Sequence, residues 1–231
     1  MQSRARRQPV TRTPRDGDNL RTVDRTRSGY DAVARAYADR FGDELDSKPF
    51  DRYVLDDFAQ RVEGLGVVVD LGCGPGQVAA YLAAQGVPVI GVDVSPGMVA
   101  TAQQHHPHLD FQVGDMRNLA FDNEAVAGIA AFYSIIHIPR AGIPAVLTEL
   151  RRLLRPGGLL LLAFHAGDRV EHLDEFFGEA VSLDFVFFSR AEMEDHLVGA
   201  GFELVWSRER GPYSDVEAPT DRTYMLSRRP T

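Results

Sequence analysis

The chain has 231 residues, a formal net charge of −8 and a hydrophobic content of 44%. These values are typical of a soluble globular protein with one α/β domain or two small ones. Cys73 is the only cysteine, which excludes an internal disulfide and a cysteine cluster for zinc. We find no apolar run long enough for a membrane span and no secretory signal, so we expect a cytoplasmic protein without a membrane partner.

Charge is distributed unevenly along the chain. Residues 1–28 contain eight Arg and three Asp, a net charge of +5, so the remainder carries −13. An acidic body argues against a nucleic-acid partner. The Arg-rich start lacks aromatic residues, and we expect residues 1–27 to form a disordered leader, with phosphate contact as the alternative.

A single domain is predicted over residues 28–231. Ser28 is a candidate N-cap, with Asp31 three residues on, for a first helix. A second helix is predicted over residues 50–62, where glycines end it. On the first helix, four residues share one face at helical spacing: Tyr30, Ala34, Tyr37 and Phe41.

The most informative stretch is a β-branched run followed by three glycines. Residues 67–69 are all valine and lead into Asp70, which indicates a buried parallel strand that ends in a tight loop and a helix. Gly72 and Gly74 allow a sharp turn and let a ligand lie against the backbone. The helix that follows directs its free N–H groups at that ligand. Asp70 lies at the carboxyl end of the strand, where open α/β sheets bind ligands.

Strands and helices then alternate. Pro156 ends the last helix of this series, and Gly157 and Gly158 turn the chain into a buried strand. The predicted fold class is α/β, a doubly wound, mostly parallel sheet with one antiparallel strand near its C-terminal edge. The predicted strands are 66–71, 87–92, 109–113, 125–132, 159–164, 202–208 and 223–228, and the helices between them are 77–85, 96–105, 143–154 and 190–198.

Asp93 ends the second predicted strand, 17 residues beyond Gly76. A carboxylate at that position can accept both hydroxyl protons of a ribose. The alternative is an ordinary turn aspartate. Ribose binding alone does not distinguish S-adenosylmethionine from NAD, because both contain a ribose.

Two segments resemble signatures of the class I S-adenosylmethionine (SAM) methyltransferases, whose fold is Rossmann-like. Residues 70–76 match the acid-x-Gly-x-Gly-x-Gly loop, and residues 154–158 match a Leu-x-Pro-Gly-Gly turn before an apolar strand. A dinucleotide-binding loop has the spacing Gly-x-Gly-x-x-Gly, whereas here the third glycine comes one residue early and Gln77 follows. The resemblance covers roughly residues 28–229.

This resemblance implies SAM as cofactor and a small-molecule acceptor. In the family, an acid at position 115 hydrogen-bonds the adenine amino group and its apolar neighbour packs on the ring. The cofactor contacts it implies are Tyr30, Asp70, Gly72, Gly74, Asp93, Val94, Met98, Asp115, Met116 and Phe132.

Residues 165–188 combine five phenylalanines with acidic residues and interrupt the regular alternation. The resemblance places such an insertion over the methyl end of the cofactor, as a substrate lid. A homodimer contact and an extra core helix are the alternatives.

His137 and His165 are the candidate catalytic residues, because each follows the carboxyl end of a central strand. An imidazole suits proton removal from a hydroxyl during methyl transfer, whereas a plain loop histidine is the alternative. No metal site is predicted. We therefore expect a SAM-dependent methyltransferase acting on a hydroxyl or amine of a small molecule, such as a secondary metabolite. The alternatives are an NAD(P)-dependent oxidoreductase and a non-catalytic SAM-binding protein.

Overall fold

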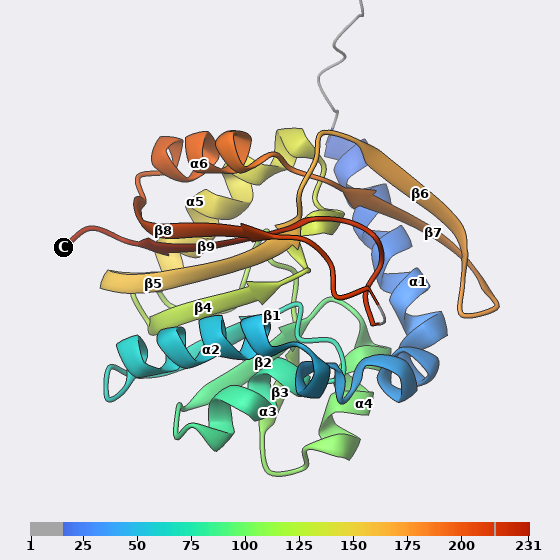
Figure 1. Cartoon of the computed structure of the whole chain (residues 1–231), viewed down its shortest axis with the longest axis horizontal. Coiled ribbons are helices and arrows are strands. Elements are labelled where there is room, and N and C mark those ends of the chain that lie inside the picture. Colours follow the sequence, from blue (N-terminus) through green and yellow to red (C-terminus); the bar gives the residue numbers. More distant parts are fainter. Residues whose placement is uncertain (1–15, 215) are drawn as a thin grey trace, which may run out of the picture.

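A computed structural model describes residues 16–214 and 216–231 of the chain, with side chains from Thr22 onward. A central twisted sheet carries helices on both faces, and a separate β-hairpin lies beside the first helix (Figure 1). The α-helices are α1 Asp16–Phe41, α2 Pro49–Val62, α3 Gln77–Ala84, α4 Pro96–His105, α5 Ile143–Leu153 and α6 Arg190–Gly199. Short 3₁₀ turns are η1 Glu44–Ser47, η2 Ile135–His137 and η3 Arg140–Gly142.

The main sheet has seven strands in the order β3-β2-β1-β4-β5-β9-β8. β9 is antiparallel to both of its neighbours, and the other pairs are parallel. The predicted fold class is therefore confirmed. The strands are β1 Val68–Leu71, β2 Val89–Asp93, β3 Asp110–Val113, β4 Val126–Phe132, β5 Leu154–His165, β8 Glu203–Arg210 and β9 Arg222–Arg228.

The strand order reverses between β1 and β4. The chain runs outward from β1 through β2 to β3 and then returns to add β4 on the other side of β1. Val68 accordingly pairs with Val89 on one side and with Gly128 on the other. A crevice opens at such a reversal, outside the carboxyl ends of the strands, and this is where doubly wound sheets bind ligands.

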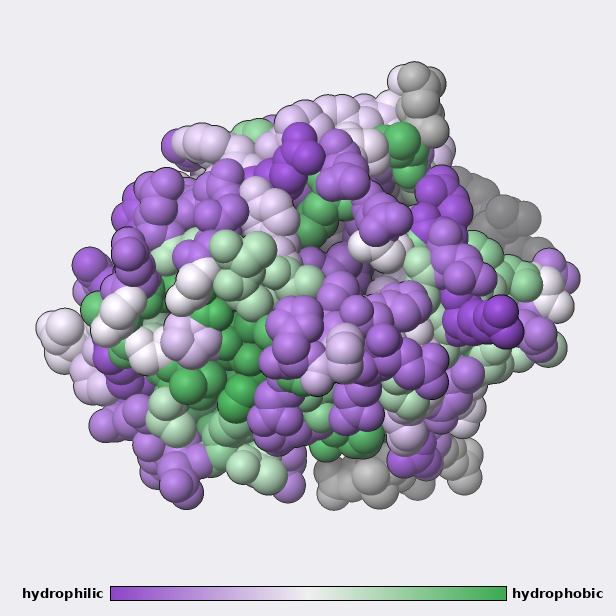
Figure 2. Space-filling model, turned by 90° about the horizontal axis from the view of Figure 1, so that it is seen from below, coloured by the Kyte–Doolittle hydropathy of each residue, from purple (hydrophilic) through white to green (hydrophobic). Residues whose placement is uncertain are grey.

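The buried strands show the two-residue alternation that separates the two faces of a sheet. On β5, Leu160, Leu162 and Phe164 pack toward α5 and α6, while Leu159 and Leu161 pack toward α2. Both faces are covered by helices, which is why these strands read as continuous apolar runs. By contrast with these buried strands, hydrophilic residues form most of the face seen in Figure 2, and hydrophobic residues gather in one region of it.

The first helix differs from the sequence prediction. Residues 16–27, assigned above to a disordered leader, belong to α1, so Ser28 lies within the helix and is not its N-cap. The rest of the predicted leader, residues 1–15, lies outside the described residues. α1 packs against α4 and β7, and the side chain of Leu183 lies 2.8 Å from where a Cβ on Gly29 would be. Tertiary packing of this kind stabilises helical segments that their local composition does not favour.

The predicted insertion is a β-hairpin made of β6 (Val170–Phe176) and β7 (Glu179–Val186), so the extra-helix alternative was wrong. Its turn places Phe177 at a φ of 52°, which is unusual for a bulky residue. The Phe177 ring packs on Tyr37 and Phe41 of α1, at centroid distances of 6.3 and 5.9 Å. These contacts fix the hairpin to α1.

Of the helices in the described part of the chain, none has the length and apolarity that crossing a membrane requires.

Candidate active site

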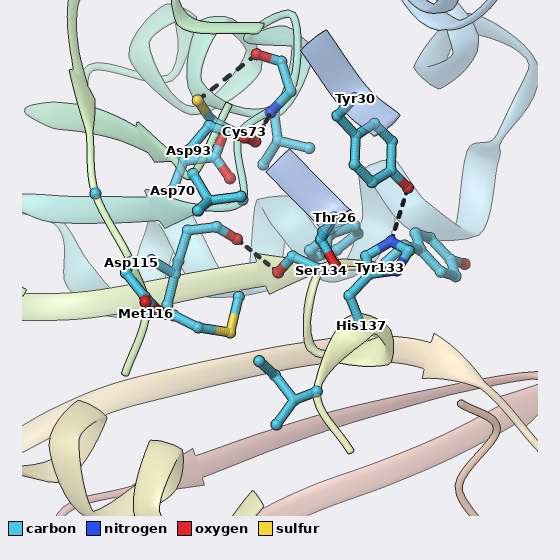
Figure 3. Close-up of a pocket in the computed structure, with 18 of the residues that line it drawn as sticks. Thr26, Tyr30, Asp70, Cys73, Asp93, Asp115, Met116, Tyr133, Ser134 and His137 are labelled. Carbon is cyan, nitrogen blue, oxygen red and sulfur yellow. Dashed lines mark hydrogen bonds between the residues drawn. The ribbon is translucent and has the colours of Figure 1, made fainter. Parts of the chain in front are cut away.

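A cavity of about 950 Å³, including its open mouth, lies at the carboxyl ends of β1 and β4 (Figure 3). It therefore occupies the reversal point of the sheet, where doubly wound α/β folds bind their ligands. α1 contributes one wall through Val23, Thr26, Tyr30 and Tyr37.

The glycine loop after β1 forms the floor of this cavity. Gly72 has a φ of +71°, and a Cβ placed on it would lie 2.2 Å from Cβ of Ser134. The Ser134 hydroxyl donates to the Leu71 carbonyl at 2.6 Å, which holds the loop after β4 against the loop after β1. A side chain at position 72 is excluded by both the backbone conformation and the space.

Asp93 lies beside this loop at the end of β2. Its Oδ2 accepts the backbone N–H of Gly74 at 2.9 Å, and its Oδ1 accepts that of Ser95 at 2.9 Å. Burial raises the pKa of Asp93, while these two N–H groups act in the opposite direction. Each oxygen retains a second lone-pair site, so the carboxylate is fixed in place and can accept further hydrogen bonds from a ligand.

Asp70 lies at the end of β1 and is only 1% exposed. Within the described residues, its Oδ2 has no hydrogen-bond partner although it lines the cavity region. Burial raises the pKa of Asp70 to about 7, an N–H of Ala79 opposes the shift, and the charge of Asp93 adds to it. An unpartnered buried carboxylate oxygen is costly, and a cationic or N–H-bearing ligand would satisfy it.

Asp115 follows β3 and faces the same cavity, next to Met116. Its carboxylate is held by Arg117: Nε donates to Oδ1 at 3.0 Å and Nη2 donates to Oδ2 at 2.6 Å. The backbone N–H of Arg117 also donates to Oδ1 at 3.0 Å. The adenine contact expected for Asp115 would therefore have to share this carboxylate with Arg117.

His137 lies in η2 and contacts α1 at the cavity wall. Its Nε2 is 2.7 Å from Oη of Tyr30, and its Nδ1 is 3.0 Å from the backbone carbonyl oxygen of Asp184 in β7. Burial lowers the pKa of His137 to about 4, although the Asp184 carbonyl and carboxylate act in the opposite direction. The imidazole is therefore neutral near pH 7, and two segments distant in sequence, α1 and β7, hold it.

His165, the second candidate base, does not line the cavity. Its ring packs between Tyr133 and Phe187, with centroids 5.3 Å from each, and its Nδ1 is 2.9 Å from the hydroxyl of Thr220. Burial and the charges of Arg222 and Lys48 lower its pKa to about 4. His165 supports the wall behind Tyr133, so the structure does not support a catalytic role for it.

Tyr133 itself is held by a buried polar chain. Its φ is +51°, and its hydroxyl lies 2.9 Å from that of Tyr224. The Tyr224 hydroxyl donates to Oδ1 of Asp51 at 2.5 Å, so its only proton is used and Tyr133 must be the donor to it. Arg210 donates to the same Asp51 oxygen at 2.7 Å. Strained backbone of this kind clusters at functional sites, and here the buried chain keeps the Tyr133 ring on the cavity wall.

The structure brings together most of the cofactor contacts implied by the sequence. Met98 is the exception: it is buried, donates its N–H to the Ser95 hydroxyl and does not line the cavity. Whether the others bind a cofactor stays a prediction. The predicted residues that line the cavity are Tyr30, Asp70, Gly72, Gly74, Asp93, Val94, Asp115, Met116, Phe132 and, as candidate base, His137.

Sequence reasoning missed several lining residues. Val23 and Thr26 fall in the segment assigned to the leader, although their spacing from Tyr30 places all three on one helical face. Glu44 of η1 carried no signal, because its position depends on contacts with Lys48 and Gln77. The other lining residues that were not singled out are Leu71, Cys73, Val78, Gly114, Tyr133, Ser134 and Ile138.

Comparisons with known proteins agree with this geometry. Residues 68–158 match the family described as "Methyltransferase domain". The chain is 36% identical over 96 residues to a demethylmenaquinone methyltransferase of Beutenbergia cavernae, covering 42% of this chain and 39% of that protein. It is 25% identical over 186 residues to a ubiquinone biosynthesis O-methyltransferase of Azorhizobium caulinodans, covering 71% of each chain.

Among solved structures, the chain resembles a Burkholderia thailandensis 1,6-didemethyltoxoflavin-N1-methyltransferase, with a TM-score of 0.70 and 21% identity over 96% of this chain and 94% of that one. A likeness at this identity concerns the fold alone. The match to the B. cavernae protein spans well under two thirds of that relative. The matched domain, the glycine loop and the sheet order together support a class I SAM-dependent methyltransferase domain over residues 68–158 of this chain.

Proposed function

We propose that this protein transfers a methyl group from SAM to a hydroxyl or amine of a small molecule, such as a secondary metabolite. The observation that carries the proposal is the convergence of the glycine loop, the fixed Asp93 carboxylate and the unpartnered Asp70 oxygen in one cavity.

The residues present fit the parts of SAM. The Asp93 oxygens suit the two ribose hydroxyls, because both are already oriented by backbone N–H groups. The bare backbone at Gly72 and Gly74 leaves room for a ligand to lie against the loop. Met116 and Phe132 offer apolar surface for the adenine. When bound, SAM would supply an activated sulfonium methyl group and a neutral thioether leaving group.

The chain's own residues contribute binding, orientation and proton transfer. Of the described residues that line the cavity, four are carboxylates and none is Lys or Arg. Glu44 and Asp115 are paired with Lys48 and Arg117 behind the wall, so Asp70 and Asp93 are the acidic groups left to attract a cationic cofactor. α1 covers one side of the cavity and limits access of water. Holding the acceptor in an in-line orientation supplies a large part of the rate enhancement in such bimolecular reactions. His137 is the candidate base for acceptors that must lose a proton.

The experiment that tests the proposal is a turnover assay with methyl-labelled SAM and a panel of small phenols, alcohols and amines. Formation of S-adenosylhomocysteine (SAH) together with a labelled product is expected for at least one class of acceptor. Tight SAM binding without any product across the panel would favour a SAM-binding protein without catalysis. Binding of NADH in place of SAM would favour the oxidoreductase alternative.

A further inference from the structure

Tyr30 and His137 form a hydrogen-bonded pair at the wall of the cavity, and the direction of that bond follows from its surroundings. Figure 3 shows the Tyr30 hydroxyl directed at the ring nitrogen of His137. On the other side of the ring, Nδ1 meets the backbone carbonyl of Asp184 at 3.0 Å. A carbonyl oxygen only accepts hydrogen bonds, so Nδ1 carries the proton of the neutral imidazole.

The Nε2 atom is therefore a lone-pair acceptor, and Tyr30 is the donor in the 2.7 Å contact. The only hydroxyl proton of Tyr30 is used in this hydrogen bond to Nε2. The Tyr30 oxygen can therefore take part in further hydrogen bonds only as an acceptor. A ligand in the cavity consequently meets Tyr30 as a hydrogen-bond acceptor backed by an imidazole base. A histidine that contacted the ligand directly would present the same basic nitrogen without this relay.

The charges of the cavity restrict the ligand further. Among the described residues that line it, four are carboxylates and none is Lys or Arg. Glu44 is paired with Lys48 at 2.6 Å, and Asp115 is paired with Arg117, but neither cation lies on the cavity wall. An anionic acceptor such as a carboxylate would find no cation on this wall and would oppose the lone pair of Tyr30.

We infer that the methyl acceptor is a neutral molecule whose hydroxyl group donates to Oη of Tyr30, and that Tyr30 relays the proton to Nε2 of His137. The inference rests on the proposed function and narrows its acceptor class from hydroxyl or amine to hydroxyl. It also gives Tyr30, expected above to contact the cofactor, direct contact with the acceptor, and makes His137 a positioning residue that acts through it.

The step balances in atoms and charge. The acceptor oxygen forms the new O–CH₃ bond as the methyl–sulfur bond breaks, and the electron pair of that bond stays on sulfur. The acceptor proton moves to the Tyr30 oxygen while the original Tyr30 proton moves to Nε2. Protonating a buried imidazole is normally costly. Here the sulfonium charge disappears as the imidazolium charge appears, so the net charge of the cavity does not change.

The direction of the hydrogen bond can be measured without turnover, by NMR of the full chain labelled with ¹⁵N-histidine. We expect His137 to show a protonated Nδ1, an unprotonated Nε2 and a pKa well below 6.5. Tyr30→Phe should shift the Nε2 resonance and raise the pKa, because the donor that stabilises the neutral ring is lost. Tyr81→Phe, which removes a hydroxyl bonded to Asp56 away from the cavity, is the matched control and should leave His137 unchanged. An unprotonated Nδ1, or a pKa that does not respond to Tyr30→Phe, would overturn the inference.

The acceptor class is tested with 1-naphthol and 1-naphthoate, which share a ring system, added to the SAH complex. The naphthol should shift Nε2 in the wild type and lose affinity at least tenfold in Tyr30→Phe when both proteins are saturated with SAH. The naphthoate should bind at least tenfold more weakly than the naphthol. Equal binding of the two probes, or no response to either, contradicts the hydroxyl assignment. Failure of SAH itself to bind would instead contradict the proposed function, and the ligand-free NMR result would still decide the direction of the relay.

Discussion

Oδ1 of Asp31 on α1 accepts two hydrogen bonds, one from the hydroxyl of Ser95 at 2.6 Å and one from the backbone N–H of Gly97 at 2.8 Å. Ser95 is also the N-cap of α4, since its hydroxyl oxygen accepts the N–H of Met98 at 3.0 Å. One charged side chain thus attaches the helix that covers the cavity to the first turn of a helix in the main fold. The negative charge lies at a helix N-terminus, where it is favourable.

Replacing Asp31 with Ala should therefore loosen α1. We expect the free energy of unfolding to fall by about 1–2 kcal/mol, the range for losing hydrogen bonds to a charged group at a partly exposed site. SAM affinity should fall too, because α1 supplies Val23, Thr26 and Tyr30 to the cavity wall. Urea unfolding and calorimetry measure the two effects. Asp31→Asn keeps an accepting oxygen and should lose less of both, and equal losses in the two variants would contradict this role.

Gly72→Ala tests the close packing of the two loops. A Cβ there would lie 2.2 Å from that of Ser134 and would need a left-handed backbone at a φ of +71°. Gly86→Ala is a matched control, because Gly86 has a φ of +82° but nothing within 4 Å of its Cβ position. The control should cost about 1–2 kcal/mol of stability from the backbone alone. Gly72→Ala should cost about 1–3 kcal/mol more from overpacking and should abolish measurable SAM binding. Equal stabilities of the two variants would show that the Ser134 contact relaxes freely.

Asp93→Ala should weaken SAM binding by about 1.5–3 kcal/mol, because it removes a fixed, charged acceptor of hydrogen bonds. Asp110→Ala, an exposed position at the start of β3, provides the control. Isothermal titration calorimetry at fixed ionic strength measures both variants. Unchanged affinity in Asp93→Ala would remove this residue from the cofactor site.

The buried imidazole of His137 should make stability depend on pH. Burial lowers its folded-state pKa to about 4, below the ordinary value of 6.5, so the unfolded chain binds more protons between these limits. Its contribution to stability is fully present above pH 6.5 and is lost as the pH falls toward 4. At about 1.4 kcal/mol per pKa unit, the loss approaches ~3 kcal/mol.

Unfolding free energies of the wild type, His137→Gln and His108→Gln between pH 7.5 and 4 test this dependence. His137→Gln should flatten the pH profile, whereas His108→Gln should not, since His108 is exposed. Parallel profiles for the wild type and His137→Gln would contradict a neutral, buried His137.

Local patterns were sufficient to predict most of the fold. The valine run before Asp70 and the cap at Ser95 each act within a few residues, and β1 and α4 lie where these patterns indicate. The turn predicted at Pro156 is different: β5 already begins at Leu154, and residues 155–158 lie in an irregular stretch where the pairing with β4 shifts register. The cavity contacts from the glycine loop and Asp93 were predictable for the same reason, because strand ends of a parallel sheet converge.

Features that depend on distant segments were not predictable from local patterns. The helical state of residues 16–27 goes with the packing of α1 against α4 and β7, which no pattern within the segment indicates. The partners of His137 lie 107 and 47 residues away in sequence, at Tyr30 and Asp184. His137 and His165 look equivalent as residues that follow central strands, and only the side-chain packing around Tyr133 separates them.

The most direct test of the proposed activity is equilibrium binding of SAM, SAH and NADH to the full-length chain by isothermal titration calorimetry. We expect SAM and SAH to bind with one site per chain and NADH to give no heat of binding or competition. Absence of SAM binding, or NADH binding that SAM displaces, would contradict the assignment of this cavity to SAM.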